Sequence, residues 1–259
     1  EDPPLYYWLG SLVLRAIDMR GDGRTYLPND YVAIGHPESP HNKNAVLHLG
    51  EDALPPTGVS RGVHILRGLS LLCSLATVAL THRTVREVIP QWPAVALGSA
   101  AVAAFDPQFL FISSGATNDA LSMMSIALAL YLAVHIVRSE RVGLPVACAM
   151  GLVVGLAALT KRTGLATIVL LPFAFAMRRY RRSGATLMRE VVFPGMLALV
   201  IALGTAGWWY LRVGAMAPHS AREGLGVLAQ AVRPASAGVQ GVRGAFASYW
   251  GLFGWLNVP

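Results

Sequence analysis

Long apolar blocks recur along this chain, and they restrict its fold more than any other feature of the sequence. Of the 259 residues, 54% are apolar and 14% are charged, whereas roughly a quarter of the residues in a soluble domain are charged. So few charges cannot cover the surface of a soluble globule of this size. The composition excludes soluble enzyme folds, disordered chains and disulfide scaffolds, and it predicts an all-α, polytopic transmembrane helix bundle.

Six apolar spans are expected, at about 62–81, 92–111, 120–137, 144–160, 164–177 and 191–211. The first apolar stretch, 5–17, contains Arg15 and would be roughly 20 Å long as a helix, which is too short for a hydrocarbon core of roughly 30 Å. We therefore predict an interfacial helix there, begun by Pro3 and Pro4, because proline is tolerated in the first helical turn.

The connectors indicate the orientation of the chain. Those near residues 83–86, 138–141 and 178–189 are rich in arginine, which marks every second connector as cytoplasmic by the positive-inside rule. The chain is thus expected to form a single membrane domain over 1–259, incomplete at both ends, with external loops at 18–60 and 212–247. The net charge of +7 indicates this orientation and no nucleic-acid partner.

Cysteine and histidine positions point to no metal site. Cys73 and Cys148 lie inside apolar blocks, where a thiol acts as a small buried hydrophobe. His36, His41 and His48 share the first loop, but their spacing matches no metal signature. We interpret them as loop histidines in solvent.

Lys161 and Arg162 follow the fourth span at its outward end, against the charge pattern of the other connectors. They form a site for a lipid-linked phosphate, with the lysine as a point charge and the arginine as a bidentate fork, or they reach outer-leaflet headgroups. Lys43 and Lys161 are the only lysines of the chain.

His64 and Arg67 are three residues apart in the first span and share one helical face. A charged residue within a span usually faces a cavity or another charge, so Arg67 is expected to be buried in a polar pocket, with simple snorkelling as the alternative. His64 by itself is typical of a hydrogen-bonded interior histidine.

Two carboxylates lie near the outward end of the spans. Asp106 precedes Pro107 in the second span, and Asn118 and Asp119 open the third. A carboxylate at a helix start caps free N–H groups and interacts favourably with the helix dipole. The functional alternative is that Asp106 and Asp119 line an external mouth, where they bind sugar hydroxyls, a metal or a basic partner.

Several strings occur in an order that resembles one family. They are Pro-Pro-Leu-Tyr-Tyr at 3–7, Asn-Lys-Asn-Ala at 42–45, Arg-Gly-Leu-Ser at 67–70, Asp-Pro-Gln-Phe-Leu-Phe at 106–111 with Asn-Asp at 118–119, Gly-Leu-Ala at 155–157 with Thr-Lys at 160–161, and Trp-Gly-Leu-Phe-Gly-Trp at 250–255. The chain resembles a bacterial GT-C membrane glycosyltransferase, similar to the dolichyl-phosphate-mannose protein mannosyltransferases of glycosyltransferase family 39.

The resemblance implies inverting transfer of a sugar from a polyprenyl-phosphate donor to a glycan, lipid or protein acceptor, at the external face of the bacterial cytoplasmic membrane. Such chemistry needs a carboxylate to take the acceptor proton and positive charge to hold the phosphate. The catalytic candidates are Asp2, Asp106 and Asp119, and the substrate-binding candidates are Lys161, Arg162, Arg67, His64, Asn118 and Lys43.

The resemblance also places the main catalytic acid of the family upstream of the 3–7 string, so we expect that acid to lie outside this chain. Some GT-C enzymes add a divalent metal ion, which this sequence neither requires nor excludes. The competing class is a transporter or flippase of lipid-linked sugars, in which charges would line a path through the membrane. We find no inverted repeat of the kind that many transporters show.

Overall fold

The computed structural model describes residues 2–17, 27–33, 36, 38–39, 41–42, 44–47, 58–140, 142–181 and 187–216. Lys43, His48, the 250–255 string and nearly all of the expected loop at 212–247 lie outside these residues. The elements in chain order are α1 (Leu5–Arg15), β1 (Leu27–Pro28), β2 (Val46–Leu47), α2 (Gly58–Val88), α3 (Pro93–Ala104), α4 (Pro107–Ser114), α5 (Asn118–Arg138), α6 (Leu144–Thr160), the 3-10 helix η2 (Arg162–Val169), α7 (Leu170–Arg181), the π-helical turn η3 (Leu187–Val192) and α8 (Phe193–Met216).

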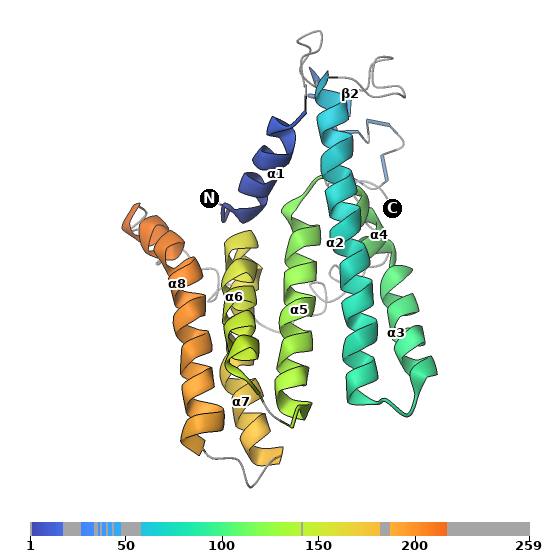
Figure 1. Ribbon diagram of the computed structural model, residues 1–259. Coiled ribbons are helices and arrows are strands. Elements are labelled where there is room, and N and C mark those ends of the chain that lie inside the picture. Colours follow the sequence, from blue (N-terminus) through green and yellow to red (C-terminus); the bar gives the residue numbers. More distant parts are fainter. Residues whose placement is uncertain are drawn as a thin grey trace, which may run out of the picture.

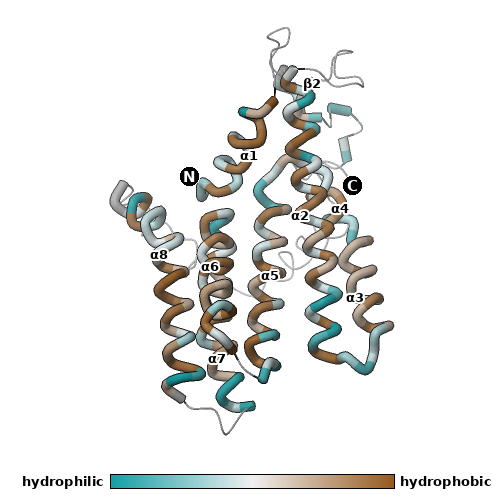
Figure 2. Tube along the Cα trace, viewed as in Figure 1, coloured by the Kyte–Doolittle hydropathy of each residue, from teal (hydrophilic) through white to brown (hydrophobic). Residues whose placement is uncertain are grey.

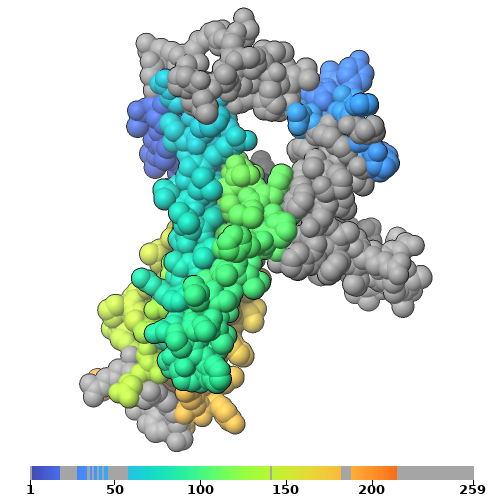
Figure 3. Space-filling model, turned by 90° about the vertical axis from the view of Figure 1, so that its right-hand side faces the viewer, coloured from blue at the N-terminus to red at the C-terminus, as the bar shows by residue number. Residues whose placement is uncertain are grey.

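The helices stand side by side as a bundle (Figure 1), which confirms the all-α membrane class. The two short strands pair antiparallel, with Leu27 opposite Leu47 and Pro28 opposite Val46. Figure 2 shows a hydrophobic middle in α8 and hydrophilic residues at the lower end of α7 and in the turn η3 that precedes α8. Figure 3 shows α2 packed beside α3 and α4 along one face.

The number of spans differs from the prediction of six. In the described part of the chain, only Gly58–Val88, Asn118–Arg138 and Met188–Gly214 are long and apolar enough to cross a membrane. A fourth span results if Pro93–Ala104 and Pro107–Ser114 count as one bent span. The predicted fourth span, α6, has 17 residues, and the predicted fifth is divided between η2 and α7.

The second predicted span is broken at Asp106, where the chain bends by 59° between α3 and α4. Pro107 is the cause, because it supplies no N–H to the preceding turn and disfavours helical backbone at the residue before it. Asp106 is accordingly extended, with φ −63° and ψ 124°. The second span therefore consists of two short helices instead of one.

Residues 162–178 run the length of α5, although they form no single long helix. At one end of the bundle Lys161 contacts Asp119, the second residue of α5, and at the other Arg178 contacts the carbonyl of Ile136 near its end. We name these two regions the Lys161 end and the Arg178 end. The segment between them begins in 3-10 form and continues as α7.

Small residues set the distance between α6 and α8. A Cβ atom on Gly151 would collide with the backbone of Ala198, and one on Gly155 would lie 2.6 Å from Cβ of Thr205. Such close packing of glycine against a neighbouring helix is typical of membrane proteins. The core beside this contact consists largely of alanines, among them Ala129, Ala147 and Ala202.

The N-terminal helix α1 is confirmed as a helix of 11 residues. It lies inclined above the end of α6 (Figure 1) and packs against α2, α5 and α6. Tyr6 contacts the cluster of Cys73, Ala120 and Leu121, while Leu5 contacts Ala158 and Leu159. The N-terminal segment therefore covers the Lys161 end, and its interfacial position in the membrane stays a prediction.

Candidate functional site

Lys161 and Asp119 form an ion pair where the start of α5 meets the end of α6. Asp119 is in the first turn of α5, and Lys161 is the residue that ends α6, with φ −154° and ψ 150°. Each charge is favoured by its own helix, since a carboxylate suits a helix N-terminus and an ammonium a C-terminus. The ends of α5 and α6 thus bring the Asp119 carboxylate and the Lys161 ammonium into contact.

The pair is open enough to meet a ligand. The side chain of Lys161 is 34% exposed and that of Asp119 is 33% exposed. Asn118 precedes Asp119 and is partly buried, and its side chain makes no hydrogen bond to any residue that the structure describes. The predicted capping role falls to Thr117, whose hydroxyl accepts the Asp119 N–H at 3.4 Å. The Asp119 carboxylate is therefore available for Lys161.

Arg162 lies next to the ion pair and is exposed. It is close enough to Tyr210 of α8 for an electrostatic interaction with the phenol. The Tyr210 hydroxyl donates a hydrogen bond of 2.7 Å to the carbonyl oxygen of Ala158, in the last turn of α6. Tyr210 thereby fixes α8 to the turn that presents Lys161 and Arg162.

Asp2 and Asp106 do not join the pair. Asp2 is exposed and accepts a hydrogen bond of 3.5 Å from the Tyr7 hydroxyl. Asp106 is 8% exposed, and its Oδ1 accepts the backbone N–H of Phe109 at 2.7 Å, as an N-cap does. Its Oδ2 is buried without a hydrogen-bond partner among the described residues. Among the described residues, Asp119 is the only one of the three catalytic candidates that forms an ion pair or side-chain hydrogen bond with a substrate-binding candidate.

The expected burial of Arg67 is wrong. Arg67 and His64 share one face of α2, as predicted, but both are exposed on the stripe that also carries Leu71 and Leu75. The opposite stripe, which includes Ser70 and is buried, packs toward α5. Arg67 makes no hydrogen bond or ion pair with any described residue. Nδ1 of His64 lies 2.9 Å from the Ser60 carbonyl oxygen of its own helix.

Sequence reasoning missed a set of buried hydroxyl groups beneath α1. The hydroxyls of Tyr6, Ser70 and Ser74 are buried and lack a well-formed hydrogen bond within the described residues. Burial raises the pKa of the Tyr6 phenol above its ordinary value of 10.0. Ser70 and Ser74 are four residues apart in an apolar helix, and this spacing was the available signal for a polar stripe.

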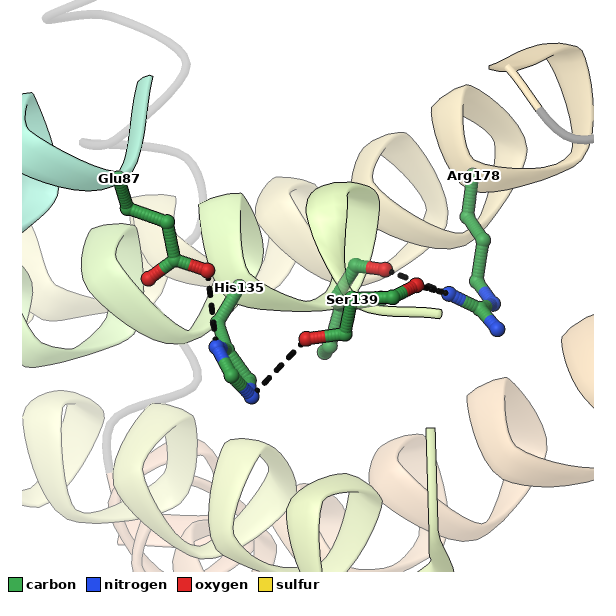
Figure 4. A network of polar contacts seen from close by, with 5 residues as sticks. Glu87, His135, Ser139 and Arg178 are labelled. Atoms are coloured by element: carbon green, nitrogen blue, oxygen red, sulfur yellow. Dashed lines mark hydrogen bonds and ion pairs between the residues drawn. The ribbon is translucent and has the colours of Figure 1, made fainter. Parts of the chain in front are cut away.

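A polar network that the sequence did not predict lies at the Arg178 end (Figure 4). Arg178 is fully buried, and its Nη1 donates to the carbonyl oxygens of Ile136, at 3.0 Å, and Ser139, at 2.6 Å. Its Nη2 lies 3.3 Å from a carboxylate oxygen of Glu190. Arg178 thus caps the C-terminus of α5, where free carbonyl groups favour a cation.

The same network includes His135, whose ring links α5 to α2. Nδ1 of His135 lies 2.9 Å from Oε1 of Glu87, and Nε2 lies 3.0 Å from the Ser139 hydroxyl. Within the described residues, no group of three or more His, Cys, Asp or Glu side chains could hold a metal ion. The ion pairs between the described helices lie at the two ends of the bundle. Lys161 and Asp119 form the pair at the Lys161 end, and the pairs of Glu87 with His135 and of Arg178 with Glu190 lie at the Arg178 end.

The sequence model of the family described as dolichyl-phosphate-mannose-protein mannosyltransferase matches residues 61–210. The matched region is more than half of the chain and includes both Asp119 and Lys161. The chain belongs to this family. It is therefore a multi-pass membrane protein of a glycosyltransferase family, as the resemblance of its strings implied, and the family implies a lipid-linked sugar donor and an acceptor. No curated protein and no solved structure matches the chain.

Proposed function

We propose that this protein transfers a sugar from a polyprenyl-phosphate donor to an acceptor, with the donor phosphate bound by Lys161 at the external face of the bacterial cytoplasmic membrane. The observation that carries the proposal is the ion pair between Lys161 and Asp119, in which each side chain is about one-third exposed. It lies in the matched family region and at the end of the bundle opposite the arginine-rich connectors.

Lys161 suits the departing phosphate. In the transfer, the bond between the anomeric carbon and the phosphate oxygen breaks, and its electron pair leaves with the phosphate. The negative charge on that oxygen therefore grows toward the transition state, where a fixed ammonium stabilises it more than in the ground state. Arg162, exposed beside Lys161, is positioned to contact the remaining phosphate oxygens.

Asp119 supports Lys161 before the donor binds. The carboxylate holds the ammonium at the end of α6, and a phosphate that approaches Lys161 competes for the same ammonium. Once Lys161 turns toward the phosphate, Asp119 is free to accept the proton of the acceptor hydroxyl, whose oxygen attacks the anomeric carbon from the opposite face. Attack from that face inverts the configuration of the sugar carbon.

The placement of charges favours a transferase over a transporter of lipid-linked sugars. The ion pairs of the described helices gather at the two ends of the bundle, Lys161 with Asp119 at one and Arg178 with Glu190 at the other. A translocation path would need such groups distributed between the ends.

The predicted orientation of the chain in the membrane has its own test. A cysteine introduced at Ser39 should react with a membrane-impermeant thiol reagent in intact cells, and one at Ser183 should be protected.

The decisive experiment measures sugar transfer from a polyprenyl-phosphate sugar by the complete enzyme. Lys161→Gln should slow transfer by roughly tenfold to a hundredfold, because one charge-assisted contact contributes about 1.5 to 3 kcal/mol. Lys161→Arg keeps the charge and should retain more activity. Arg83→Gln removes an exposed cation from α2, outside the Lys161 end, and serves as the control. Equal rates for wild type and Lys161→Gln would remove Lys161 from the site.

A further inference from the structure

A groove on the side of the bundle carries features of a second ligand site, far from the Lys161 end. It lies between α5 and α7, beside the last residue of α2, and encloses about 260 Å³. Its lining is apolar apart from two arginines. The lining residues are Val88, Leu130, Ala133, Val134, Val137, Arg138, Leu170, Phe173, Met177 and Arg181.

The two arginines lie at one end of this groove. Arg138 is the last residue of α5 and Arg181 the last residue of α7. On α7, Phe173 and Met177 precede Arg181 at intervals of four, so the three share one helical stripe. The groove thus has a long apolar part of about 12 Å, from Leu130 to Arg138, and it ends at two arginine side chains.

The walls of the groove are fixed by Arg178, which is the buried arginine of the same helix. Its hydrogen bonds to the carbonyl oxygens of Ile136 and Ser139 (Figure 4) hold the end of α7 against the end of α5. The side chains of Arg138 and Arg181, in contrast, make no hydrogen bond or ion pair with any residue that the structure describes. The structure therefore places two arginines at one end of a preformed apolar groove.

The chemistry of the groove identifies its occupant. Leu130 is 44% exposed and Phe173 56% exposed, so the groove opens sideways toward the surrounding lipid. An acyl chain fits the apolar part, and a phosphate diester fits two guanidinium groups, which bind phosphate oxygens in a bidentate manner. Anionic lipids are concentrated in the cytoplasmic leaflet, where basic residues attract them, and the arginine-rich connectors mark this end as cytoplasmic.

We propose that this groove binds one anionic phospholipid, with an acyl chain along α5 and α7 and the phosphate between Arg138 and Arg181. The site is independent of the proposed transfer reaction, because none of its residues belongs to the Lys161 end. The bound lipid would hold the C-terminal end of α7 at the level of the lipid headgroups. A zwitterionic lipid carries its own cation beside the phosphate, which the two arginines repel, and a free phosphate ion has no acyl chain, so neither satisfies both parts of the site.

The test uses the complete protein in vesicles of neutral phosphatidylcholine with a phosphatidylglycerol probe that carries a photoreactive group on its acyl chain. Mass spectrometry of the labelled peptides should place the label on α5 between 130 and 137 and on α7 between 170 and 177. Unlabelled phosphatidylglycerol should compete with the probe at least about tenfold better than phosphatidylcholine or inorganic phosphate.

Two variants of equal charge separate this site from general attraction of anionic lipid. Arg138→Gln with Arg181→Gln should reduce the labelling about tenfold or more, whereas Arg83→Gln with Arg86→Gln, two exposed arginines of α2 at the same end, should leave it unchanged. Equal labelling in both double variants, equal competition by phosphatidylcholine, or competition by inorganic phosphate as strong as by the lipid would overturn the proposal.

A third variant tests the apolar part. Val134→Trp fills the groove from the α5 side while it retains both arginines, and it should reduce labelling on the stripe as strongly as the loss of the arginines. Unchanged labelling there would contradict an acyl chain in the groove. If a second copy of the chain covers this face instead, labelling should fall as protein density in the vesicles rises, without regard to competitor, and that result would also overturn the proposal.

Discussion

Gly164 packs so tightly beneath the end of α6 that a Cβ atom at this position would collide with the carbonyl oxygen of Ala157. The turn at Lys161 depends on this approach, because the Gly164 N–H also donates to the Lys161 carbonyl oxygen at 2.9 Å. The chain can therefore reverse direction directly after α6 and enter η2 without a loop.

We expect Gly164→Ala to shift η2 away from α6 and to destabilise the protein by about 1 to 3 kcal/mol, as overpacking does. Transfer should fall as well, because Lys161 moves with the turn. Gly204→Ala is the control, since a Cβ atom there meets nothing within 4 Å. Thermal unfolding in detergent, read by tryptophan fluorescence, checks the difference, and equal midpoints for the two variants would contradict the tight packing.

Asp119→Asn should separate stability from activity. The ion pair with Lys161 is about one-third exposed on each side, so its loss should cost no more than about 1 kcal/mol of folding free energy. Transfer should decrease tenfold or more if Asp119 positions Lys161 and takes the acceptor proton. The double variant with Lys161→Gln should be little slower than the slower single variant, and strictly multiplicative losses would show that the two residues act separately.

Asp106 should behave as a helix cap. Asparagine caps a helix about as well as aspartate does, whereas alanine loses the cap at a cost of about 1 kcal/mol. Asp106→Asn should therefore keep both stability and transfer, while Asp106→Ala should lower the unfolding temperature. A loss of transfer in Asp106→Asn without loss of stability would return Asp106 to the list of catalytic groups.

Replacement of Arg178 by methionine should destabilise the bundle by about 3 to 5 kcal/mol, since it leaves the buried carbonyl groups at the end of α5 unpaired. Hydrogen exchange should rise first in the last turn of α5 and in α7. Arg83→Gln, on the exposed side of α2, should have no such effect. If both variants unfold alike, the hydrogen bonds of Arg178 contribute little to stability.

Local patterns in the sequence predicted the helices but not all of their ends. The bounds of α6 agree with the prediction, because Gly143 and Pro145 mark its start and Lys161 its end. The break at Asp106 was missed, although Pro107 is a visible signal, since the apolar run continues through it. The 3-10 form of η2 depends on the contact between Gly164 and α6, which no local pattern reveals.

Contacts between residues that are far apart in the chain could not be predicted from the sequence. Lys161 and Asp119 were each singled out, but they are 42 positions apart, and only the packing of α5 against α6 brings them together. Arg178 was read as one of several arginines of a cytoplasmic connector. Nothing in its neighbourhood distinguishes it from exposed Arg181, because its partners are carbonyl groups of another helix.

The close contact between α6 and α8 fixes a height as well as a distance. Because Gly151 lies against the backbone of Ala198 and Gly155 against Thr205, neither helix can slide by a turn of about 5.4 Å without forcing side chains into backbone. The ammonium of Lys161 therefore keeps a constant depth relative to α8. A phosphate that is anchored by a lipid tail also has a fixed depth, so the two would meet by lateral diffusion in the plane of the membrane.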